Sequence, residues 1–157
     1  MSAGTLAAIN DHFLNEGRTP VFSHGLLALE LPREELLSMA ARLKDVYGFD
    51  LLLDVTAVDW PAREPRFDVV WHFYSTRDHV RMRLKTAVSA DDPVVDSLVS
   101  LYGSAGFMER ECHDMFGIRF EGNPDLRPIL LYEGFEGHPL RKDYPKEQEQ
   151  PLVRYRT

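Results

Sequence analysis

Three segments in the middle of the chain alternate apolar and polar residues, and this pattern constrains the fold more than any other feature. They span residues 49–60, 67–74 and 80–88. A period of two places successive side chains on opposite faces of a strand. The connections, residues 61–65 and 75–79, are too short for a crossover, so an antiparallel meander is predicted.

The first and third of these strands divide into two faces. In the first, one face is expected to carry Phe49, Leu51, Leu53, Val55 and Ala57 and to be buried, while the other face is mixed. In the third, Val80, Met82, Leu84 and Thr86 alternate with Arg81, Arg83 and Lys85. A basic stripe of this kind is typical of solvated surface or of contact with an acidic neighbour.

Apolar residues at helical spacing predict four helices around these strands. The first runs to about residue 16, the second covers residues 32–48, the third runs from a cap at Asp92 to about residue 102, and the fourth covers residues 105–116. Residues 21–30 favour a short hairpin around His24. This order predicts an α+β fold, a two-layer domain with helices on one face of a mixed, largely antiparallel five-stranded sheet.

The final quarter of the chain does not have the pattern of a domain. With 157 residues, one domain is expected, and we assign residues 1–116 to it and residues 117–157 to an extended, partner-binding C-terminal arm. Residues 117–151 contain nine Gly or Pro, yet they also carry apolar residues such as Ile118, Phe120 and Leu130. Because a solvated tail would hold fewer apolar residues, we expect the arm to become ordered on the surface of another protein.

Charge and composition exclude several classes of function. The chain has 18 Lys and Arg against 25 Asp and Glu, which gives a net charge of -7, the wrong sign for holding nucleic acid or an anionic membrane. No apolar run approaches the ~18 residues that cross a bilayer. Residues 1–10 lack the basic start of a signal peptide, so a cytosolic location is expected.

The densest polar cluster, residues 109–114, is the main candidate for chemistry. Cys112 and His113 are adjacent on a predicted helix and point about 100° apart, so His113 is badly placed to activate the thiol. Glu109 and His113 could share a metal only if further ligands came from elsewhere. A single cysteine excludes an internal disulfide and an iron–sulfur cluster held by thiolates. His138 is a candidate proton carrier, although an interface role suits it better.

Three stretches resemble a known family. They are Glu-Arg-Glu-Cys-His-Asp-Met-Phe-Gly-Ile-Arg-Phe at residues 109–120, Asn-Pro-Asp-Leu-Arg at 123–127 and Gly-Phe-Glu-Gly-His-Pro-Leu-Arg-Lys-Asp-Tyr-Pro at 134–145. Together they are similar to the signature of the 30 kDa subunit, also called the C subunit, of respiratory complex I. The likeness extends over about residues 30–146.

The resemblance implies a subunit of the hydrophilic arm of a proton-pumping NADH:quinone oxidoreductase, on the cytoplasmic side of a bacterial membrane. Such subunits hold no flavin, cluster or quinone of their own and pack against the 49 kDa-type subunit, so no cofactor and a scaffolding role are expected. Carried over by position, the interface residues would be Glu109, Arg110, Glu111, Asp114, Gly117, Pro124, Leu126, Arg127, Gly137, His138, Pro139, Leu140, Arg141, Lys142, Asp143 and Pro145. Arg127 and Arg141 would make bidentate contacts with partner carboxylates.

Two other hypotheses remain open at this point. The chain could be the equivalent subunit of a membrane-bound hydrogenase related to complex I. It could instead be a small standalone enzyme that uses Cys112, His113 and Asp114, which requires a thiol that reacts readily near neutral pH.

Overall fold

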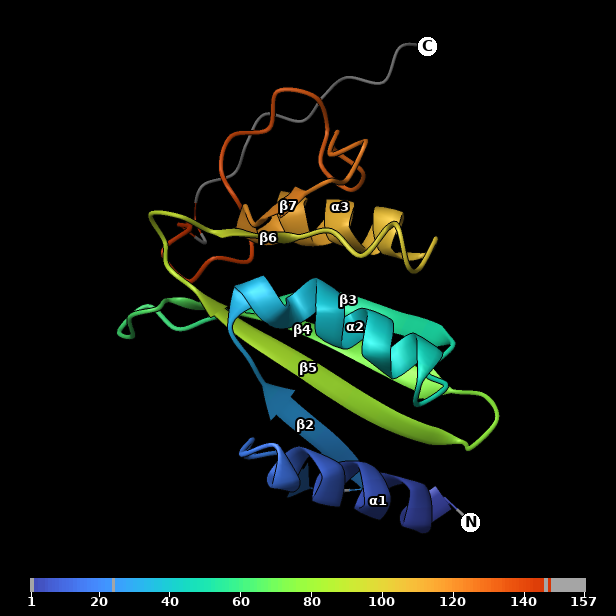
Figure 1. Ribbon diagram of the computed structural model, residues 1–157. Coiled ribbons are helices and arrows are strands. Elements are labelled where there is room, and N and C mark those ends of the chain that lie inside the picture. The colour runs from blue at the N-terminus through green and yellow to red at the C-terminus, as the bar shows by residue number, and fades with distance from the viewer. Residues whose placement is uncertain (1, 24, 146, 148–157) are drawn as a thin grey trace.

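The computed structural model describes residues 2–23, 25–145 and 147, and Figure 1 shows how their helices and strands are arranged. In chain order these are α1 (Ser2–Asn15), β1 (Val21–Ser23), β2 (Leu26–Glu30), the 3-10 turn η1 (Arg33–Glu35), α2 (Leu36–Asp45), β3 (Leu51–Asp59), β4 (Phe67–Ser75), β5 (Val80–Val88), β6 (Val94–Asp96), α3 (Ala105–Phe116) and β7 (Arg119–Glu121). The order agrees with the sequence prediction as far as β5 and departs from it afterwards.

Five strands form one mixed sheet in the order β1-β2-β5-β4-β3. The predicted meander is confirmed, because β3 pairs antiparallel with β4 and β4 antiparallel with β5. The predicted hairpin is confirmed as well, since β1 pairs antiparallel with β2, although His24 at its turn lies outside the described residues. Strand β2 then runs parallel to β5, which makes the sheet mixed.

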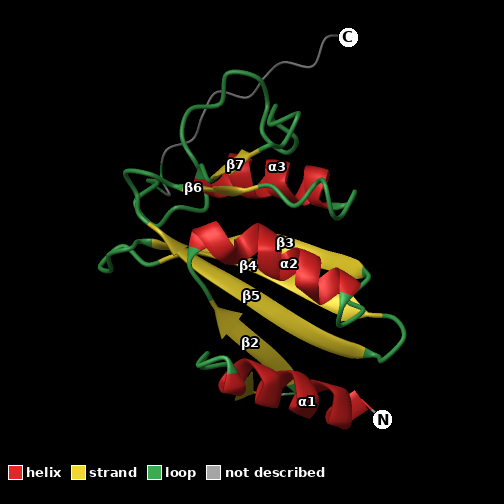
Figure 2. Cartoon of the chain, in the orientation of Figure 1, coloured by secondary structure: helices red, strands yellow, loops and turns green. Residues whose placement is uncertain are grey.

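Helices α1, α2 and α3 pack on one face of this sheet, and Figure 2 shows α1 and α2 in front of the strands. Phe13 of α1, Leu43 of α2 and Cys112 of α3 belong to the same buried cluster as Trp71 and Leu84 of the sheet. Because Trp71 and Leu84 are paired neighbours on β4 and β5, their side chains point to the same face. The predicted α+β class, with helices on one side of the sheet, is therefore confirmed.

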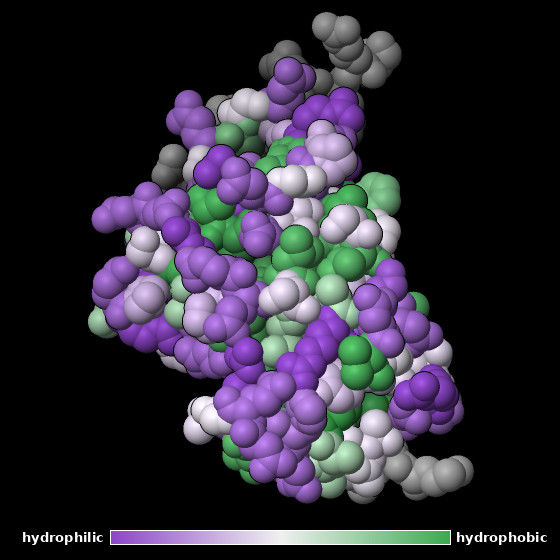
Figure 3. Space-filling model, in the orientation of Figure 1, coloured by the Kyte–Doolittle hydropathy of each residue, from purple (hydrophilic) through white to green (hydrophobic). Residues whose placement is uncertain are grey.

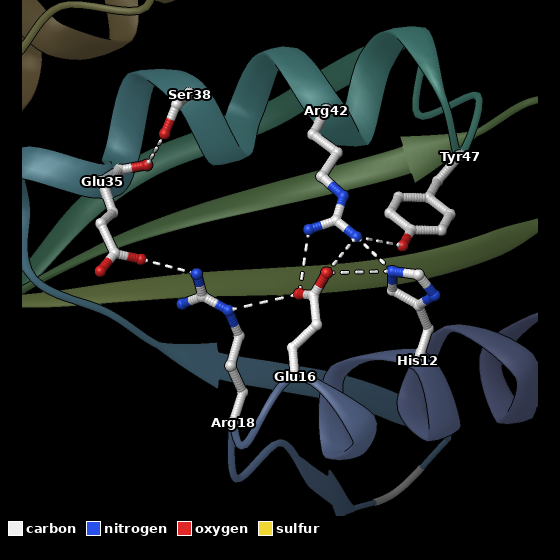
Figure 4. A network of polar contacts seen from close by, with 7 residues as sticks. All are labelled: His12, Glu16, Arg18, Glu35, Ser38, Arg42 and Tyr47. Carbon is white, nitrogen blue, oxygen red and sulfur yellow. Dashed lines mark hydrogen bonds and ion pairs between the residues drawn. The ribbon is translucent and has the colours of Figure 1, made fainter.

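A polar network fastens α1 to α2 (Figure 4). The Arg42 guanidinium on α2 donates hydrogen bonds to Glu16, just after α1, at 2.7 and 3.0 Å, and it also contacts His12. Arg18 donates to Glu35 over 2.7 Å and lies 3.7 Å from Glu16. The Arg42 bond holds the pKa of the Glu16 carboxyl below its ordinary value. The network thus fixes the two helices side by side above the apolar core.

The predicted faces of β3 are wrong in its first half. Leu51 and Leu53 are exposed, whereas Leu52 is buried and pairs with Phe73. The register of β3 against β4 shifts between Leu52 and Asp54, which is a β-bulge. One extra residue moves the following side chains to the opposite face, and a strict period of two therefore fails here.

The helix predicted to start at Asp92 and to run to about residue 102 is wrong. Residues 94–96 form strand β6, which pairs parallel with β7 in a separate two-stranded sheet. The buried residues Val95, Leu98 and Tyr102 have helical spacing, which explains the prediction. Pairing with residues distant in the sequence overrides this local pattern.

The chain stays packed against the domain beyond residue 117, where the arm is expected to start. Ile118 and Phe120 are almost completely buried and belong to the main core, and strand β7, which contains Phe120, pairs with β6. The packed domain therefore continues at least to Glu121, because these two side chains are buried in the core and β7 extends the pairing with β6. The rest of the assignment of residues 117–157 to partner binding stays a prediction.

Candidate interface site

The end of α3 is shaped for a close approach of the arm. Gly117 ends the helix with φ 73°, in the left-handed region, and its N–H donates to the His113 carbonyl at 2.8 Å. A Cβ at this position would lie 2.5 Å from both the Arg141 Nη2 and His138 Nε2 atoms. Glycine is therefore required both for the backbone conformation and for the space that the two arm side chains occupy.

The arm satisfies carbonyl groups that α3 leaves free at its C-terminal end. The His138 ring nitrogen Nδ1 donates to the Asp114 carbonyl at 2.9 Å, and the N–H of Leu140 donates to the Met115 carbonyl at 3.1 Å. The Arg141 Nε donates to the Phe116 carbonyl at 2.6 Å. The last carbonyls of a helix lack partners within the helix, and a cation is favourable beside them. Partial burial lowers the pKa of His138, which favours its neutral form.

Asp114 holds a second part of the arm from inside the protein. Its Oδ2 atom accepts hydrogen bonds from the N–H groups of Ile129, Leu130 and Leu131 at 2.8, 3.0 and 3.3 Å. The carboxylate is almost completely buried, so these three donors replace water around its charge. This side chain therefore gives residues 129–131 a defined path across α3.

Arg110, one turn before Asp114, fixes the preceding loop. Its guanidinium donates to the carbonyl oxygens of Arg127 and Pro128, each at 2.9 Å. Arg127 itself donates twice to Asp125, at 2.9 and 2.8 Å. The bidentate contact that the resemblance implies for Arg127 is thus made within this chain, and the carboxylate belongs to Asp125.

The arm also reaches the sheet at the end of β3. Asp59, whose side chain is completely buried, accepts hydrogen bonds from Arg66 at 2.7 and 2.8 Å and from the backbone N–H of Lys142 at 2.7 Å. Arg66 also donates to Asp143 at 2.8 Å. The Arg66 bond holds the pKa of Asp59 below its ordinary range despite burial, so the carboxylate remains charged.

Two guanidinium groups share the Phe67 ring beside this carboxylate. The Arg66 group lies 5.0 Å and the Arg141 group 5.1 Å from the ring centre, within the range of cation–π contacts. Arg141 forms no ion pair among the residues that the structure describes. The carboxylate partner expected for it is therefore not supplied by the described part of this chain.

Glu109 and Asp114 differ from the other expected interface residues because they are buried in the interior. Glu109 is completely buried and accepts hydrogen bonds from Ser97 Oγ at 2.7 Å, the Leu98 N–H at 2.8 Å and Asn123 Nδ2 at 2.8 Å. Burial raises its pKa. Both side chains organise loops of their own chain, and their predicted part in the subunit interface stays a prediction.

The other expected residues lie nearer the surface. Glu111, Pro124, Arg127, Gly137, Leu140, Lys142, Asp143 and Pro145 are exposed, whereas Arg110, Gly117, Leu126, His138, Pro139 and Arg141 are half-buried. All belong to α3 or to the chain after it. Their contact with a partner remains a prediction.

The arm is fastened by polar contacts, while several of its apolar side chains point outwards. Leu130 is 62% exposed and Leu140 51%, and Ile129 is partly exposed as well. Phe107 on α3 is 65% exposed and lies on the same helical stripe as Arg110 and Asp114. Figure 3 shows hydrophobic residues reaching the surface around α3 among hydrophilic neighbours. Phe107, Ile129, Leu130 and Leu140 are thus apolar side chains exposed on α3 and the arm.

The sequence analysis missed three residues that seat the arm, namely Asp59, Arg66 and Phe67. A signal was available, because the predicted meander places the end of the first strand opposite the start of the second, and Asp59 does pair with Phe67. What the sequence lacks is any sign that residues 141–143 return to this place. Contacts with its own domain therefore help to order the arm, in addition to the contacts with a partner that the sequence predicts.

The thiol chemistry considered for Cys112 has no support in the geometry. The thiol is buried, and burial raises its pKa well above the ordinary value. The His113 Nδ1 atom lies 2.9 Å from the Ile118 carbonyl, to which it can donate. No group of three or more His, Cys, Asp or Glu residues in the described ranges could hold a metal ion. Among these residues no helix combines the length and apolarity needed to cross a membrane.

Comparison with known proteins gives a matching family and similar curated proteins. The family described as "Respiratory-chain NADH dehydrogenase, 30 Kd subunit" matches residues 29–150. The NADH-quinone oxidoreductase C subunit of Xanthobacter autotrophicus is 46% identical over 125 residues, which are 78% of this chain and 59% of that protein. The C 1 subunit of the Rhizobium etli enzyme is 48% identical over 124 residues, which are 78% of this chain and 62% of that protein. The chain thus spans less than two thirds of the length of either relative.

Two solved structures share the fold. A trypsin-resistant fragment of Nqo5 matches with a TM-score of 0.71 and 33% identity, covering 78% of this chain and 99% of that one. A chain of an archaeal membrane-bound sulfane sulfur reductase matches with a TM-score of 0.77 and 26% identity, covering 90% and 86%. The fold therefore defines the chain as an α+β protein of the Nqo5 type. The chain belongs to the family of the 30 kDa subunit of respiratory-chain NADH dehydrogenase.

Proposed function

We propose that this chain is a non-catalytic assembly subunit in the peripheral arm of a proton-translocating NADH:quinone oxidoreductase. It docks on the 49 kDa-type subunit and keeps neighbouring subunits at fixed distances for electron transfer. It carries no cofactor of its own and reaches the cytoplasmic side of the bacterial inner membrane only as part of the complex. Family membership supports the assembly, and the arm supports the mode of contact.

One observation about the arm carries the proposal. Its main chain is held by hydrogen bonds to the domain, while several of its apolar side chains point outwards into solvent. Asp114, Arg110 and Asp59 fix the arm through hydrogen bonds to its main chain. Leu130 and Leu140 are left exposed, although burying each would gain roughly 1.5–3 kcal/mol. A surface whose path is already fixed loses less conformational entropy on binding than a free tail, so it suits a stable contact between subunits.

Affinity purification of the tagged chain at native expression, with identification of the co-purifying subunits, tests this function. Leu130→Asp should reduce recovery of the 49 kDa-type subunit strongly, because it places a charge in an interface that would otherwise be apolar. Leu37→Asp is the matched control, because Leu37 is an exposed leucine on α2 and not on the arm. Equal recovery with Leu130→Asp, Leu37→Asp and the unaltered chain would refute docking through the arm.

A second candidate is the equivalent subunit of a membrane-bound relative of complex I, such as a hydrogenase. The observation in its favour is the structural match to a chain of an archaeal respiratory membrane complex that is a sulfane sulfur reductase. The same purification separates the two. NADH-binding subunits among the co-purifying proteins support the NADH enzyme, whereas hydrogenase-type subunits without them support the alternative.

A further inference from the structure

No helix or strand that the structure describes covers the face of the sheet opposite the helices, although Trp60 and Arg63 of the loop after β3 lie over Asp68 near the start of β4. Side chains on this face alternate with the buried ones of the core, and they include the exposed residues Leu51, Val58 and Val21. Val21 pairs with Ala28, and Ala28 pairs with Arg83, so these three residues follow one another across β1, β2 and β5 on this face. We call this side of the sheet the open face.

The open face carries positive charge that the described residues do not neutralise. Lys85 lies 3.4 Å from Asp68 and 3.7 Å from Glu30, so its charge is balanced. Arg81 and Arg83 form no ion pair in the described part of the chain. Their charge stands out because the whole chain has a net charge of -7.

Arg83 also has an unsatisfied hydrogen-bond donor. Its Nε atom is shielded from solvent and has no acceptor among the described residues. Its cross-strand neighbour on β4 is His72, which is half-buried. Burial and the charges of Arg83 and Arg81 lower the pKa of His72. Asp54, which pairs with His72 from β3, acts in the opposite direction and raises this pKa. Asp54 on β3 and Arg83 on β5 are therefore separated by His72 on β4. Asp54 forms no ion pair with Arg83. Buried donors without partners are uncommon in folded proteins, which indicates that an acceptor is missing here.

A hollow lies next to Arg83 on this face. It has a volume of about 700 Å³, and its lining includes Arg83 and Lys85 on one side and Val21 and Ala28 on the other. Glu30 also lines it, but its charge is balanced by Lys85. The cationic side suits a carboxylate, and the apolar side suits an aliphatic or aromatic side chain next to it. A short peptide segment offers both kinds of group, with a spacing set by its own backbone.

We propose that the open face is a second docking surface, which receives an acidic, partly apolar segment of another protein. This inference rests on the proposed function in one respect, because it takes that protein to be a further subunit of the same assembly. The arm and the open face lie on different parts of the domain, so the chain would bridge two neighbours. Bridging is what an assembly subunit requires.

Charge decides between the occupants of this face. Nucleic acid and anionic lipid are disfavoured, because the acidic remainder of the chain would repel them. A carboxylate-bearing protein segment is small enough to meet Arg81 and Arg83 without approaching the acidic residues elsewhere. Electrostatic complementarity of this kind guides association and fixes orientation.

Site-specific photo-cross-linking in the intact complex tests the proposal. A benzophenone amino acid is placed at Val21 beside the hollow, at Leu130 on the arm, and at Leu37 on the helix side as a control. The proposal predicts that Val21 cross-links to a different subunit or a different segment from Leu130, and that Leu37 gives no product. Adding Arg83→Glu should reduce the Val21 product roughly tenfold and leave the Leu130 product unchanged. Thermal unfolding of the variant chain checks that it folds.

The outcomes separate this inference from the proposed function. A Leu130 product without a Val21 product overturns the open face alone, because the complex has then formed without it. Absence of both products overturns the proposed function and this inference with it. A Val21 product with nucleic acid or with a second copy of this chain also overturns the acidic-partner proposal. A Val21 product that Arg83→Glu leaves unchanged shows that charge does not select the occupant, and it equally overturns the proposal.

Discussion

The Asp114 carboxylate provides the sharpest test of how the arm is held. Asp114→Ala removes the acceptor of three backbone N–H groups, those of residues 129–131. One hydrogen bond to a charged group contributes roughly 1.5–3 kcal/mol. Because three donors share a single oxygen, we take their combined contribution as about 3 kcal/mol. At ~1.4 kcal/mol per factor of ten, local opening of this segment should become roughly 100-fold more frequent.

Amide hydrogen exchange in the isolated chain measures this opening directly. The amides of residues 129–131 should exchange roughly 100-fold faster in Asp114→Ala, whereas those of β4 should change much less. Asp114→Asn keeps a neutral acceptor of the same shape and should fall between, with exchange roughly tenfold faster. Glu111→Ala serves as the control, because Glu111 is exposed on the same helix and its side chain has no described partner.

Two results would refute the reasoning. If the three amides exchange equally slowly in Asp114→Ala and in the unaltered chain, the carboxylate does not hold the arm. If they exchange at the rate of an unfolded peptide in the unaltered chain, the arm is not seated without a partner, and the polar contacts of α3 contribute little. Either outcome would favour the expectation from the sequence alone, in which the arm becomes ordered only on the surface of another protein.

Two further predictions concern buried groups. Asp59→Asn should lower the free energy of unfolding by about 3 kcal/mol at neutral pH, since it removes the negative half of a desolvated pair with Arg66. The pKa of Asp59 is lowered in the folded protein, so its contribution is complete above the unfolded value of ~3.9 and is lost as pH falls through the folded pKa. Urea unfolding at several pH values should therefore show the gap between variant and unaltered chain closing below about pH 4, and a constant gap would contradict this. Cys112 should react with a maleimide roughly 100-fold more slowly in the native chain than in urea, and a native thiol as reactive as free cysteine would revive the thiol-enzyme hypothesis.

The sequence alone determined the elements whose pattern is local. The period of two in residues 67–74 and 80–88 predicted β4 and β5, and the apolar stripe ending at Gly117 predicted α3 with its residue bounds. These predictions succeed because the periodicity of a strand or a helix is expressed by residues close together in the chain. The family resemblance was also available from the sequence, since it rests on contiguous motifs.

The tertiary structure alone decided the features that depend on distant partners. The bulge at Leu52 arises from pairing with β4, and residues 94–96 become a strand because residues 119–121 lie beside them. The seat of the arm joins Asp59 to Lys142, which are separated by 83 positions in the chain. A local pattern cannot specify such contacts, because their stability comes from burial and from hydrogen bonds that exist only once the chain has folded.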